Sequence, residues 1–301
     1  MTILSRAPFG GISLRGVYGR SWKTFASDLW REISDDDVIN GAAAVAFYLT
    51  FSLFPALLFL LSLIPLLPLP DLRDSILSMM NEALPGEAAA LIRKTIQEVL
   101  LLRHTGLLSI GAALTLWAAS TGVYALMQQL DFTNGVKDRR PYWRARLTAI
   151  VLLMGFGLLT VLAFTLVIVG DSLLTWLQAE LSWTAPFAFI YNLARWLFVA
   201  LALSTAFSLV YYFGPDVKQE FRLITPGSLL GVAGMVAASL LFKVYVRNFG
   251  NYNATYGSIG AVIVLMLWLN ILGVVTLVGS EVNALLESYS QGEETTKTEA
   301  A

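Results

Sequence analysis

The sequence contains no cysteine and one histidine, and these shortages exclude several kinds of site. Without cysteine the chain forms no disulfide, offers no thiolate to a metal and has no thiol nucleophile. His104 stands beside Arg103 before a hydrophobic run, a position typical of a plain interfacial residue. Because histidine is the commonest general base and metal ligand, we expect no metal and no other cofactor.

Charge is also scarce, at 14% of the 301 residues against about 25% in soluble domains. Hydrophobic residues reach 56%, above the usual 45 to 50% or so, and a soluble protein this apolar would expose aggregating patches. Membrane lipids are therefore the expected partners. A net charge of −1 argues against a nucleic-acid surface, which needs clustered Lys and Arg.

Six apolar stretches are long enough to cross a bilayer, since hydrocarbon about 30 Å thick needs roughly 20 helical residues. The stretches are Val38 to Pro70, Thr105 to Leu130, Leu147 to Gly170, about Phe187 to Phe213, Leu223 to Phe242, and Asn248 to Ser280. Backbone groups in lipid must pair within their own segment, which requires helices. The sequence predicts an all-α polytopic membrane protein with six transmembrane helices and an amphipathic helical pair between the first and second.

The connections on one side of these helices carry most of the basic residues. Thirteen Lys and Arg fall in the amino-terminal segment, the second and fourth connections and the tail, and five fall in the other connections. By the positive-inside rule both termini are cytoplasmic. Tyr142 and Trp143 then lie at the inner headgroup level, and Trp176 and Trp183 at the outer one. The first 37 residues do not resemble a cleavable signal peptide.

Three regions follow from this pattern. Residues 1–37 form a cytoplasmic amphipathic segment in which Tyr18, Trp22, Phe25, Leu29 and Ile33 make one helical stripe suited to a membrane surface. Asp35 to Asp37 favour the start of the next helix. Residues 38–287 form the six-helix domain, and 288–301 a disordered cytoplasmic tail. The outer insert, about 71–104, is either a lid over a cavity or an interfacial pair resting on lipid.

Several sequence blocks resemble those of a known family. They are AAAVAFYLTFSLFPALLFL, GVKDRRPYWRARL, YYFGPDV with ITPGSLL, and NYNATYGSIGAVIVLMLWL followed by GSEVNALLE. Over roughly residues 20 to 287 the chain resembles the YihY/BrkB membrane proteins, also called virulence factor BrkB-like. The resemblance implies a bacterial inner-membrane protein of six helices.

Some relatives carry the name ribonuclease BN, but the residues here speak against nuclease activity. Metal-dependent RNA cleavage needs clustered His, Asp and Glu ligands, and metal-free cleavage needs an acid and base pair. This chain has one histidine and no carboxylate cluster beyond Asp35 to Asp37. We therefore expect no enzyme.

Charged and polar residues within or near the apolar helices are the candidate binding sites, because burying a charge in lipid costs at least about 2.5 kcal/mol. Arg195 and Lys243 are predicted at similar depths in the outer half, where a bound anion would relieve their repulsion. Arg247, Tyr252 and Tyr256 would stand at the mouth of that site. The alternatives are snorkelling of Lys243 and Arg247 to the interface, an interfacial or carbonyl-bonded Arg195, and simple loop packing of the tyrosines.

Two further groups complete the candidates. Tyr48 and Ser52, one turn apart beside the helix-kinking Pro55, are predicted to line a cavity. Gln128, Glu281 and Asn283 end two helices at the inner side, where they form either an inner gate or interhelical hydrogen bonds. Small residues in two helices predict close packing: Gly227, Gly231, Gly234 and Ala238 in one, and Ala118 and Gly122 in the other.

Two functions fit these features. One is a transporter, exporter or flippase-like protein for an anionic or amphiphilic small molecule or lipid, and the other is a non-transporting scaffold or envelope-maintenance protein. No phosphate-binding loop of the GxxxxGKS type is present, so ATP-driven transport by this chain alone is not expected.

The basic-residue bias makes a direct prediction of topology. Reporters fused after Arg140 and after Lys218 should be cytoplasmic, and reporters near Glu87 and Trp183 should be external. Alkaline phosphatase and green fluorescent protein fusions at each position measure this, because the first is active only outside and the second only inside. If the phosphatase fusion near Glu87 is inactive and the green fluorescent protein fusion there is fluorescent, the predicted topology is reversed.

Overall fold

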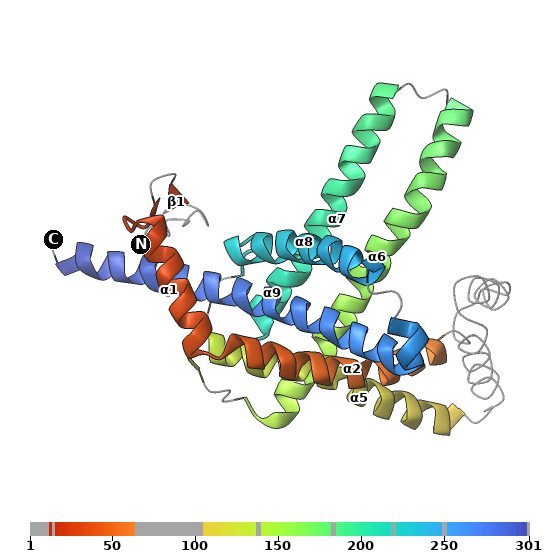
Figure 1. Cartoon of the computed structure of the whole chain (residues 1–301), viewed down its shortest axis with the longest axis horizontal. Helices are drawn as coiled ribbons and strands as arrows, with labels where there is room; N and C mark the ends of the chain where they lie inside the picture. Colours follow the sequence, from red (N-terminus) through yellow and green to blue (C-terminus); the bar gives the residue numbers. More distant parts are fainter. Residues whose placement is uncertain are drawn as a thin grey trace.

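The computed structural model describes residues 12–13, 16–63, 105–136, 140–181, 185–217, 219, 221–248 and 252–299. Within them a small antiparallel hairpin of β1 (Ile12–Ser13) and β2 (Gly16–Val17) precedes seven helices. The helices are α1 (Trp22–Asp35), α2 (Val38–Leu63), α5 (Thr105–Thr133), α6 (Tyr142–Leu181), α7 (Ala185–Phe213), α8 (Pro226–Asn248) and α9 (Tyr252–Glu299). Figure 1 shows α2, α5 and α9 side by side, while α6 and α7 pair into an arm that rises away from them.

Each of the six predicted apolar stretches corresponds to one long helix, α2 and α5 to α9. Among the described residues, four helices have stretches long and apolar enough to cross a membrane, at Tyr142–Leu159, Pro186–Phe213, Pro226–Arg247 and Val262–Ser290. A shorter apolar stretch, Val38–Leu53, lies in α2. The all-α class is confirmed and the four candidate spans fit a polytopic membrane protein, while crossing by all six helices stays a prediction.

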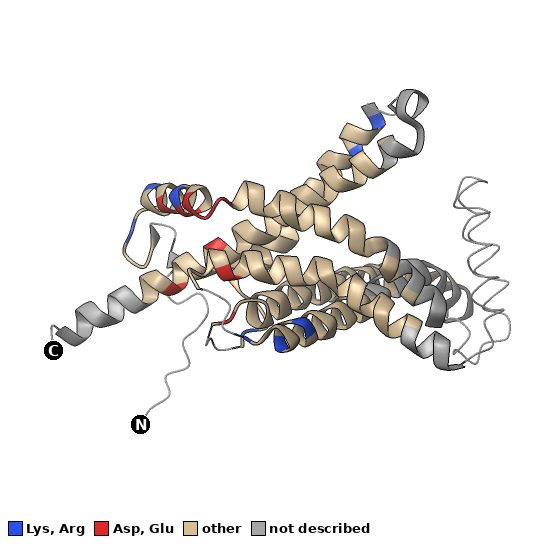
Figure 2. Cartoon of the chain, turned by 90° about the horizontal axis from the view of Figure 1, so that it is seen from below, with Lys and Arg blue, Asp and Glu red and all other residues tan. Residues whose placement is uncertain are grey.

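Successive long helices run in opposite directions, so that several of their ends meet. Contacts join the starts of α2, α6 and α8 to the ends of α5 and α7 and to residues 277–290 of α9. We name this region, together with α1, the α1 end. Figure 2 shows charged residues gathered near it and at the far end of α8, with few along the middle of the helices. Ionisable groups thus avoid the part of the molecule that hydrocarbon would surround.

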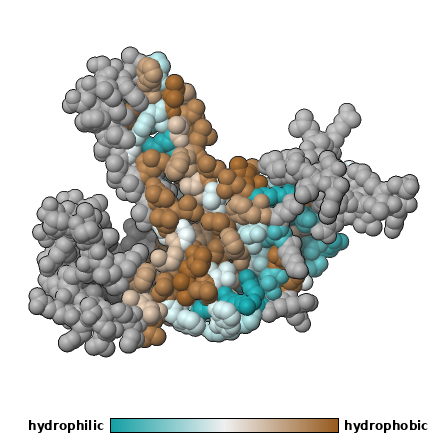
Figure 3. All heavy atoms as spheres, turned by 180° about the vertical axis from the view of Figure 1, so that it is seen from behind, coloured by the Kyte–Doolittle hydropathy of each residue, from teal (hydrophilic) through white to brown (hydrophobic). Residues whose placement is uncertain are grey.

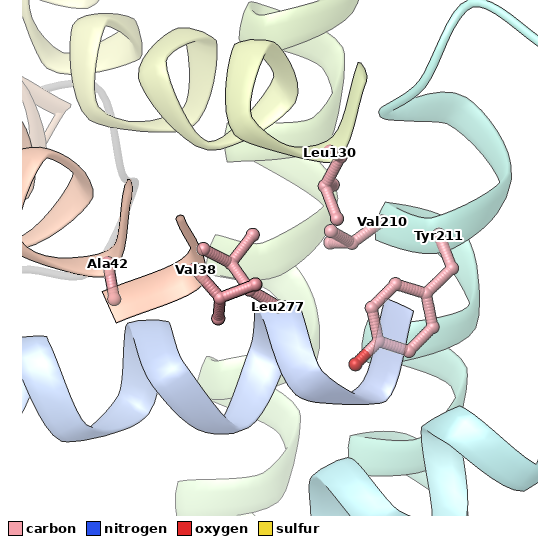
Figure 4. Packing of buried hydrophobic residues seen from close by; sticks show 6 residues of the cluster. All are labelled: Val38, Ala42, Leu130, Val210, Tyr211 and Leu277. Atoms are coloured by element: carbon pink, nitrogen blue, oxygen red, sulfur yellow. The ribbon is translucent and has the colours of Figure 1, made fainter. Parts of the chain in front are cut away.

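The core of the α1 end is an apolar cluster drawn from four helices. Its buried members are Val38, Ala42, Leu130, Val210, Tyr211 and Leu277. Figure 4 shows the Tyr211 ring lying along α9 with its hydroxyl turned toward that helix. This hydroxyl donates a hydrogen bond to the carbonyl oxygen of Thr276 at 2.9 Å, so the cluster buries an aromatic ring without leaving its polar atom unpaired.

The predicted amphipathic helix before the membrane domain exists as α1, but its apolar stripe packs against protein. Ser21 caps the helix by accepting from the Thr24 N–H at 3.2 Å. Phe25 and Leu29 pack against a cluster on α9 that includes Leu285 and Tyr289. The expectation of a helix resting on the membrane surface is therefore wrong for this part of the stripe, because α9 extends far enough to cover it.

Two other boundaries differ from prediction. The connection expected after Gly170 is instead the last part of α6, which includes Asp171 and Glu180. No proline or glycine interrupts residues 171–181, so nothing local ends the helix at Gly170. The tail expected to be disordered from 288 continues α9 to Glu299. Tyr289 packs against α1 and so holds this part of α9 in place.

The small residues predicted to allow close packing do so. A Cβ at Gly122 would lie 2.6 Å from Leu49 Cδ2 and 2.9 Å from Leu49 Cα, so α5 approaches the backbone of α2. In α8, a Cβ at Gly227 would collide with the Gly279 carbonyl, and one at Gly234 would lie 2.8 Å from Val275 Cγ1. Contact between helix backbones is the usual mode of association in lipid, where apolar burial alone gives little preference.

The outer surface away from the α1 end is apolar. Figure 3 shows hydrophobic side chains over the α6 and α7 arm and the middle of the molecule, with hydrophilic ones toward the α1 end. Leu197 on α7 and Leu241 on α8 are among the large apolar side chains that are exposed. Lipid covers such a surface without penalty, whereas water would not.

The α2 and α5 contact yields a stability prediction. Replacing Gly122 by alanine should lower stability by about 1 to 3 kcal/mol, because the new methyl group meets the Leu49 backbone and overpacks the contact. Thermal unfolding in detergent measures the change. Gly157→Ala on α6 is the matched control, since no described atom lies within 4 Å of its new Cβ. Alanine there should be neutral or raise stability by up to about 1 kcal/mol. An equal gain in both variants would contradict the close packing.

Candidate functional site

A buried carboxyl pair lies at the α1 end. Glu281 on α9 is 2% exposed, and its Oε1 atom has no hydrogen-bond partner among the described residues. Asp36, in the corner between α1 and α2, forms a side-chain hydrogen bond with Glu281. Two carboxyl groups bond to each other only when one of them holds a proton, because an ionised carboxylate has no donor. The pair is thus built to share a proton.

The backbone of the corner explains how Asp36 reaches α9. The Asp36 N–H donates to the Glu32 carbonyl at 2.9 Å and ends α1. Asp37 takes a positive φ of 49°, which reverses the chain, and its carbonyl accepts from the Gly41 N–H at 2.9 Å to begin α2. Two helices therefore meet in a tight turn that holds the Asp36 side chain against Glu281.

The prediction that Asp35 to Asp37 serve the helix start is corrected by this geometry. Asp37 stands where α2 begins, but its carboxylate accepts from the Asn40 side-chain amide at 2.8 Å and 3.0 Å. Asp36 instead turns to Glu281. Burial raises the pKa of Asp36 above its ordinary value, as do the nearby Glu32 and Asp35, although its hydrogen bond with Glu281 lowers it.

Polar side chains from α5 hold α9 next to the pair. The hydroxyls of Thr133 and Ser280 lie 2.8 Å apart and are both buried. The Asn134 amide donates to Ser280 Oγ at 3.3 Å and to the Leu130 carbonyl at 2.7 Å. Ser280 directly precedes Glu281, so these bonds fix the height of α9 relative to α5.

Asn283, predicted as part of an inner gate or of an interhelical bond, makes the second kind of contact. Its Oδ1 accepts from the Gly227 N–H at 2.8 Å, and its amide donates to Thr225 Oγ1 at 3.1 Å. The side chain thus satisfies a free backbone donor in the first turn of α8 from the neighbouring helix. The geometry favours a structural role for this member of the proposed gate.

Gln128, the third member of the proposed gate, does not share the contacts that Asn283 makes. Its side chain is exposed and reaches Tyr124 OH only at 3.5 Å. In the described part of the chain, no hydrogen bond joins it to Glu281 or Asn283. The structure therefore connects Glu281 to Asp36 and Asn283 to α8, and it leaves a gate formed by all three residues as a prediction.

Asp131 and Arg140 form a junction that the sequence does not reveal. Asp131 Oδ1 accepts from the Asp216 N–H at 2.7 Å, and its Oδ2 lies 3.6 Å from Arg140 Nη2. Arg140 also donates to the carbonyls of Phe213 at 3.1 Å and Gly214 at 2.8 Å. The ends of α5 and α7 and the chain entering α6 are thereby joined. The only sequence signal is that charged turn residues follow α5 and α7.

The residues predicted for an outer anion site lie on two different helices, α7 and α8. Arg195 is 7% exposed and lies against α6, where its Cδ would be 2.7 Å from a Cβ at Gly170. Lys243 and Arg247 are exposed on α8, and Figure 1 shows one end of α7 rising away from α8. The side chains of Tyr252 and Tyr256 lie outside the described residues. A common site for Arg195 and Lys243 thus stays a prediction.

Tyr48 and Ser52 also lie in different surroundings. The Tyr48 side chain is exposed, with its ring centre 5.4 Å from that of Phe47. Ser52 is buried against α5 and donates to the Leu49 carbonyl at 2.9 Å. A cavity lined by both side chains stays a prediction. His104 and the insert 71–104, with its predicted lid, lie outside the described residues.

The Asp36 environment predicts how stability depends on pH. A raised pKa means that the folded state binds the proton more tightly than the unfolded state does. The stabilisation is complete below the ordinary Asp value of about 3.9 and is lost as pH rises through the raised value. The unfolding temperature in detergent should therefore fall as pH increases through this range.

Asp36→Asn should flatten this pH dependence, because the amide donates to Glu281 at every pH. Asp37→Asn is the control, since its exposed side chain bonds Asn40 and not α9. Unfolding temperatures measured from pH 4 to 8 for the three proteins give the comparison. Equal slopes in the parent and Asp36→Asn would show that the pair does not share a proton.

Comparisons with known proteins place this chain in a family. The family model described as virulence factor BrkB matches residues 29–301. A Bacillus subtilis protein named for its likeness to ribonucleases, YfkH, is 32% identical over 263 residues, which cover 87% of this chain and 95% of that protein. A UPF0761 membrane protein of Alkalilimnicola ehrlichii is 27% identical over 294 residues, covering 93% of this chain and 62% of its own length.

A UPF0761 membrane protein of Xanthomonas campestris pv. campestris (strain B100) is 23% identical over 279 residues, covering 88% of this chain and 61% of its own length. The chain thus spans less than two thirds of the length of these UPF0761 relatives. No solved structure matches it. The family model covers nearly the whole chain, including all the helices that carry the carboxyl pair. The chain belongs to the virulence factor BrkB family of membrane proteins.

Proposed function

We propose that this protein moves an anionic or amphiphilic small molecule or lipid across the bacterial inner membrane, and that protonation of the Glu281 and Asp36 pair is coupled to the movement. The observation that carries the proposal is the hydrogen bond between a fully buried Glu281 and Asp36. The proposal places both termini in the cytoplasm, which puts the α1 end on the inner side, in keeping with the basic-residue bias.

The position of the pair supports coupling. Asp36 belongs to the corner of α1 and α2, and Glu281 belongs to α9, so the pair joins two separate elements. If these elements moved apart, two carboxyl groups would gain access to water and release the shared proton. If they closed, one proton would be taken up again, because two buried charges would repel. Carboxyl groups within membrane domains mark proton relays in pumps and transporters.

We infer an anionic or amphiphilic substrate from the residues of the α6 and α7 arm. Arg195 is a buried cation between α6 and α7, and the outer surfaces of both helices are apolar. A molecule with a negative head and an apolar body suits such surroundings, because the head meets the cation while the body meets apolar side chains.

A scaffold or envelope-maintenance role is the second candidate, favoured by the bonds that tie the α1 end together. Asn283 bonds the first turn of α8, and Arg140 bonds two carbonyls at the end of α7. Such a fixed end suits a protein that holds partners in place. We propose no RNA cleavage, although the fold adds Glu281 to the acidic corner. In the described residues no three His, Cys, Asp or Glu side chains gather to hold a metal.

Lipid movement in reconstituted vesicles tests the transport proposal. Vesicles containing the protein and phosphatidylglycerol labelled with nitrobenzoxadiazole on one acyl chain are treated with dithionite, which bleaches only the outer leaflet. A pH gradient across the vesicle should accelerate label exchange between leaflets. Glu281→Gln should reduce the gradient-dependent rate at least about tenfold, which corresponds to a barrier about 1.4 kcal/mol higher, because the amide does not titrate.

Glu287→Gln is the matched control, since it removes one carboxylate from an exposed position on the same helix. It should keep the parent rate, and an unchanged unfolding temperature should confirm that each variant is folded. Rates equal to those of protein-free vesicles for the parent protein, with and without the gradient, would reject lipid transport and favour the scaffold.

A further inference from the structure

A second buried cation lies between α5 and α6, and it is enclosed by aromatic rings. The Arg146 Cζ atom lies 4.9 Å from the ring centre of Trp117, 5.2 Å from that of Tyr124 and 5.9 Å from that of Tyr142. Trp117, Thr121 and Tyr124 follow one another at helical spacings on α5, and Tyr142 precedes Arg146 by one turn of α6. The two helices together thus form an aromatic cage around one guanidinium.

The guanidinium in this cage has no counter-charge among the described residues. Its Nη2 atom donates a hydrogen bond to Thr121 Oγ1 at 3.3 Å. Nε and Nη1 are buried without a hydrogen-bond partner in the described structure, and no described carboxylate forms an ion pair with Arg146. The side chain is 6% exposed. Ring faces attract a cation but accept N–H groups only weakly, so most of the donors of this side chain lack a strong acceptor.

The cage opens toward the apolar surface of the molecule. Trp117 is 42% exposed and Tyr142 is 56% exposed, and both lie on the outer side of the guanidinium. The large apolar side chains of Leu114, Trp143 and Leu147 are exposed around them. Aromatic rings beside exposed apolar side chains at a helix start are typical of the headgroup level of a bilayer. The anion present in quantity at that depth is the phosphate of a membrane lipid.

We propose that Arg146 and the rings of Trp117, Tyr124 and Tyr142 form a binding site for the phosphate of an anionic membrane phospholipid. The planar guanidinium fork presents its unpaired Nε and Nη1 donors to two phosphate oxygens, a geometry that suits arginine better than lysine. Tyr142 begins α6 and is the most exposed ring of the cage, so its rotation opens these donors to the headgroup. The acyl chains then lie over Leu114 and Leu147.

Arg144 provides a control within the same turn of α6. It carries the same charge and lies near an aromatic ring, with its Cζ atom 5.1 Å from the ring centre of Trp143. Its side chain, however, is exposed. A general attraction between basic residues and anionic lipid would involve Arg144 as much as Arg146, whereas the cage distinguishes the two.

Native mass spectrometry of the delipidated protein, titrated with dioleoyl phosphatidylglycerol, tests the site. Arg146→Gln should weaken binding of the tightest lipid at least about tenfold, and Arg144→Gln less than about twofold. Equal losses in the two variants, or none in Arg146→Gln, would overturn the proposal. Arg146→Lys keeps the charge without the fork and should weaken binding about threefold or more. If Arg146→Gln does not fold, the Arg146→Lys variant tests the site in its place. An Arg146→Lys protein that binds the lipid as tightly as the parent would also overturn the proposal.

The source of the phosphate is tested separately. A large excess of inorganic phosphate should leave the lipid bound, because it has no acyl chains to contact the apolar rim. Displacement of the lipid by inorganic phosphate would overturn the lipid assignment in favour of a soluble ligand. The titration requires no transport, so its failure and the failure of the vesicle assay are distinguishable.

Discussion

The structure depends on one constraint, which is that polar backbone groups at helix ends must find partners where packed helices exclude water. At the α1 end those partners come from neighbouring helices. Asn283 of α9 accepts from the first turn of α8, and Arg140 donates to the last carbonyls of α7. Asp131 accepts from the chain that follows α7. Each bond satisfies a backbone group that would otherwise lack a partner, and each also fixes one helix against another.

This pairing divides the molecule into two kinds of region. At the α1 end, helices approach until backbones touch, as at Gly227 and Gly279, and side-chain bonds connect successive helices. Away from it, α6 and α7 form an arm that rises from the other helices, as Figure 1 shows, and Figure 3 shows hydrophobic residues on its surface. In lipid such divergence costs little, because an apolar side chain gains almost nothing by leaving hydrocarbon for protein.

Within the tightly bonded end, two groups stand out because their bonding is incomplete. Glu281 shares a proton-dependent bond with Asp36 and leaves Oε1 without a described partner, and Arg146 leaves two nitrogens unpaired inside its aromatic cage. Buried polar atoms are nearly always satisfied in folded proteins, so exceptions mark places where a proton or ligand completes the set. The carboxyl pair is acidic and suits a proton, whereas the cage holds a cation and suits an anionic headgroup.

Local sequence patterns were sufficient to predict the fold class and the course of the helices. Apolar runs of about 20 residues predicted all six long helices, and the small residues around Gly122 and Gly227 predicted close packing. These features follow from properties that act over a few turns, namely hydrophobicity, backbone pairing and side-chain size. Where the prediction of extent failed, as at the end of α6 and of α9, a change in composition was mistaken for the end of a helix.

The sequence by itself thus determined that the chain is helical, that lipid is its main solvent and that its motifs resemble one membrane family. Only the tertiary structure decided which polar groups meet. Asp36 pairs with Glu281, Arg146 enters a cage from α5, and Arg195 lies against Gly170 of α6. The physical reason is that an apolar helix face looks the same whether lipid or protein covers it, so the pattern along a membrane helix does not specify its neighbours.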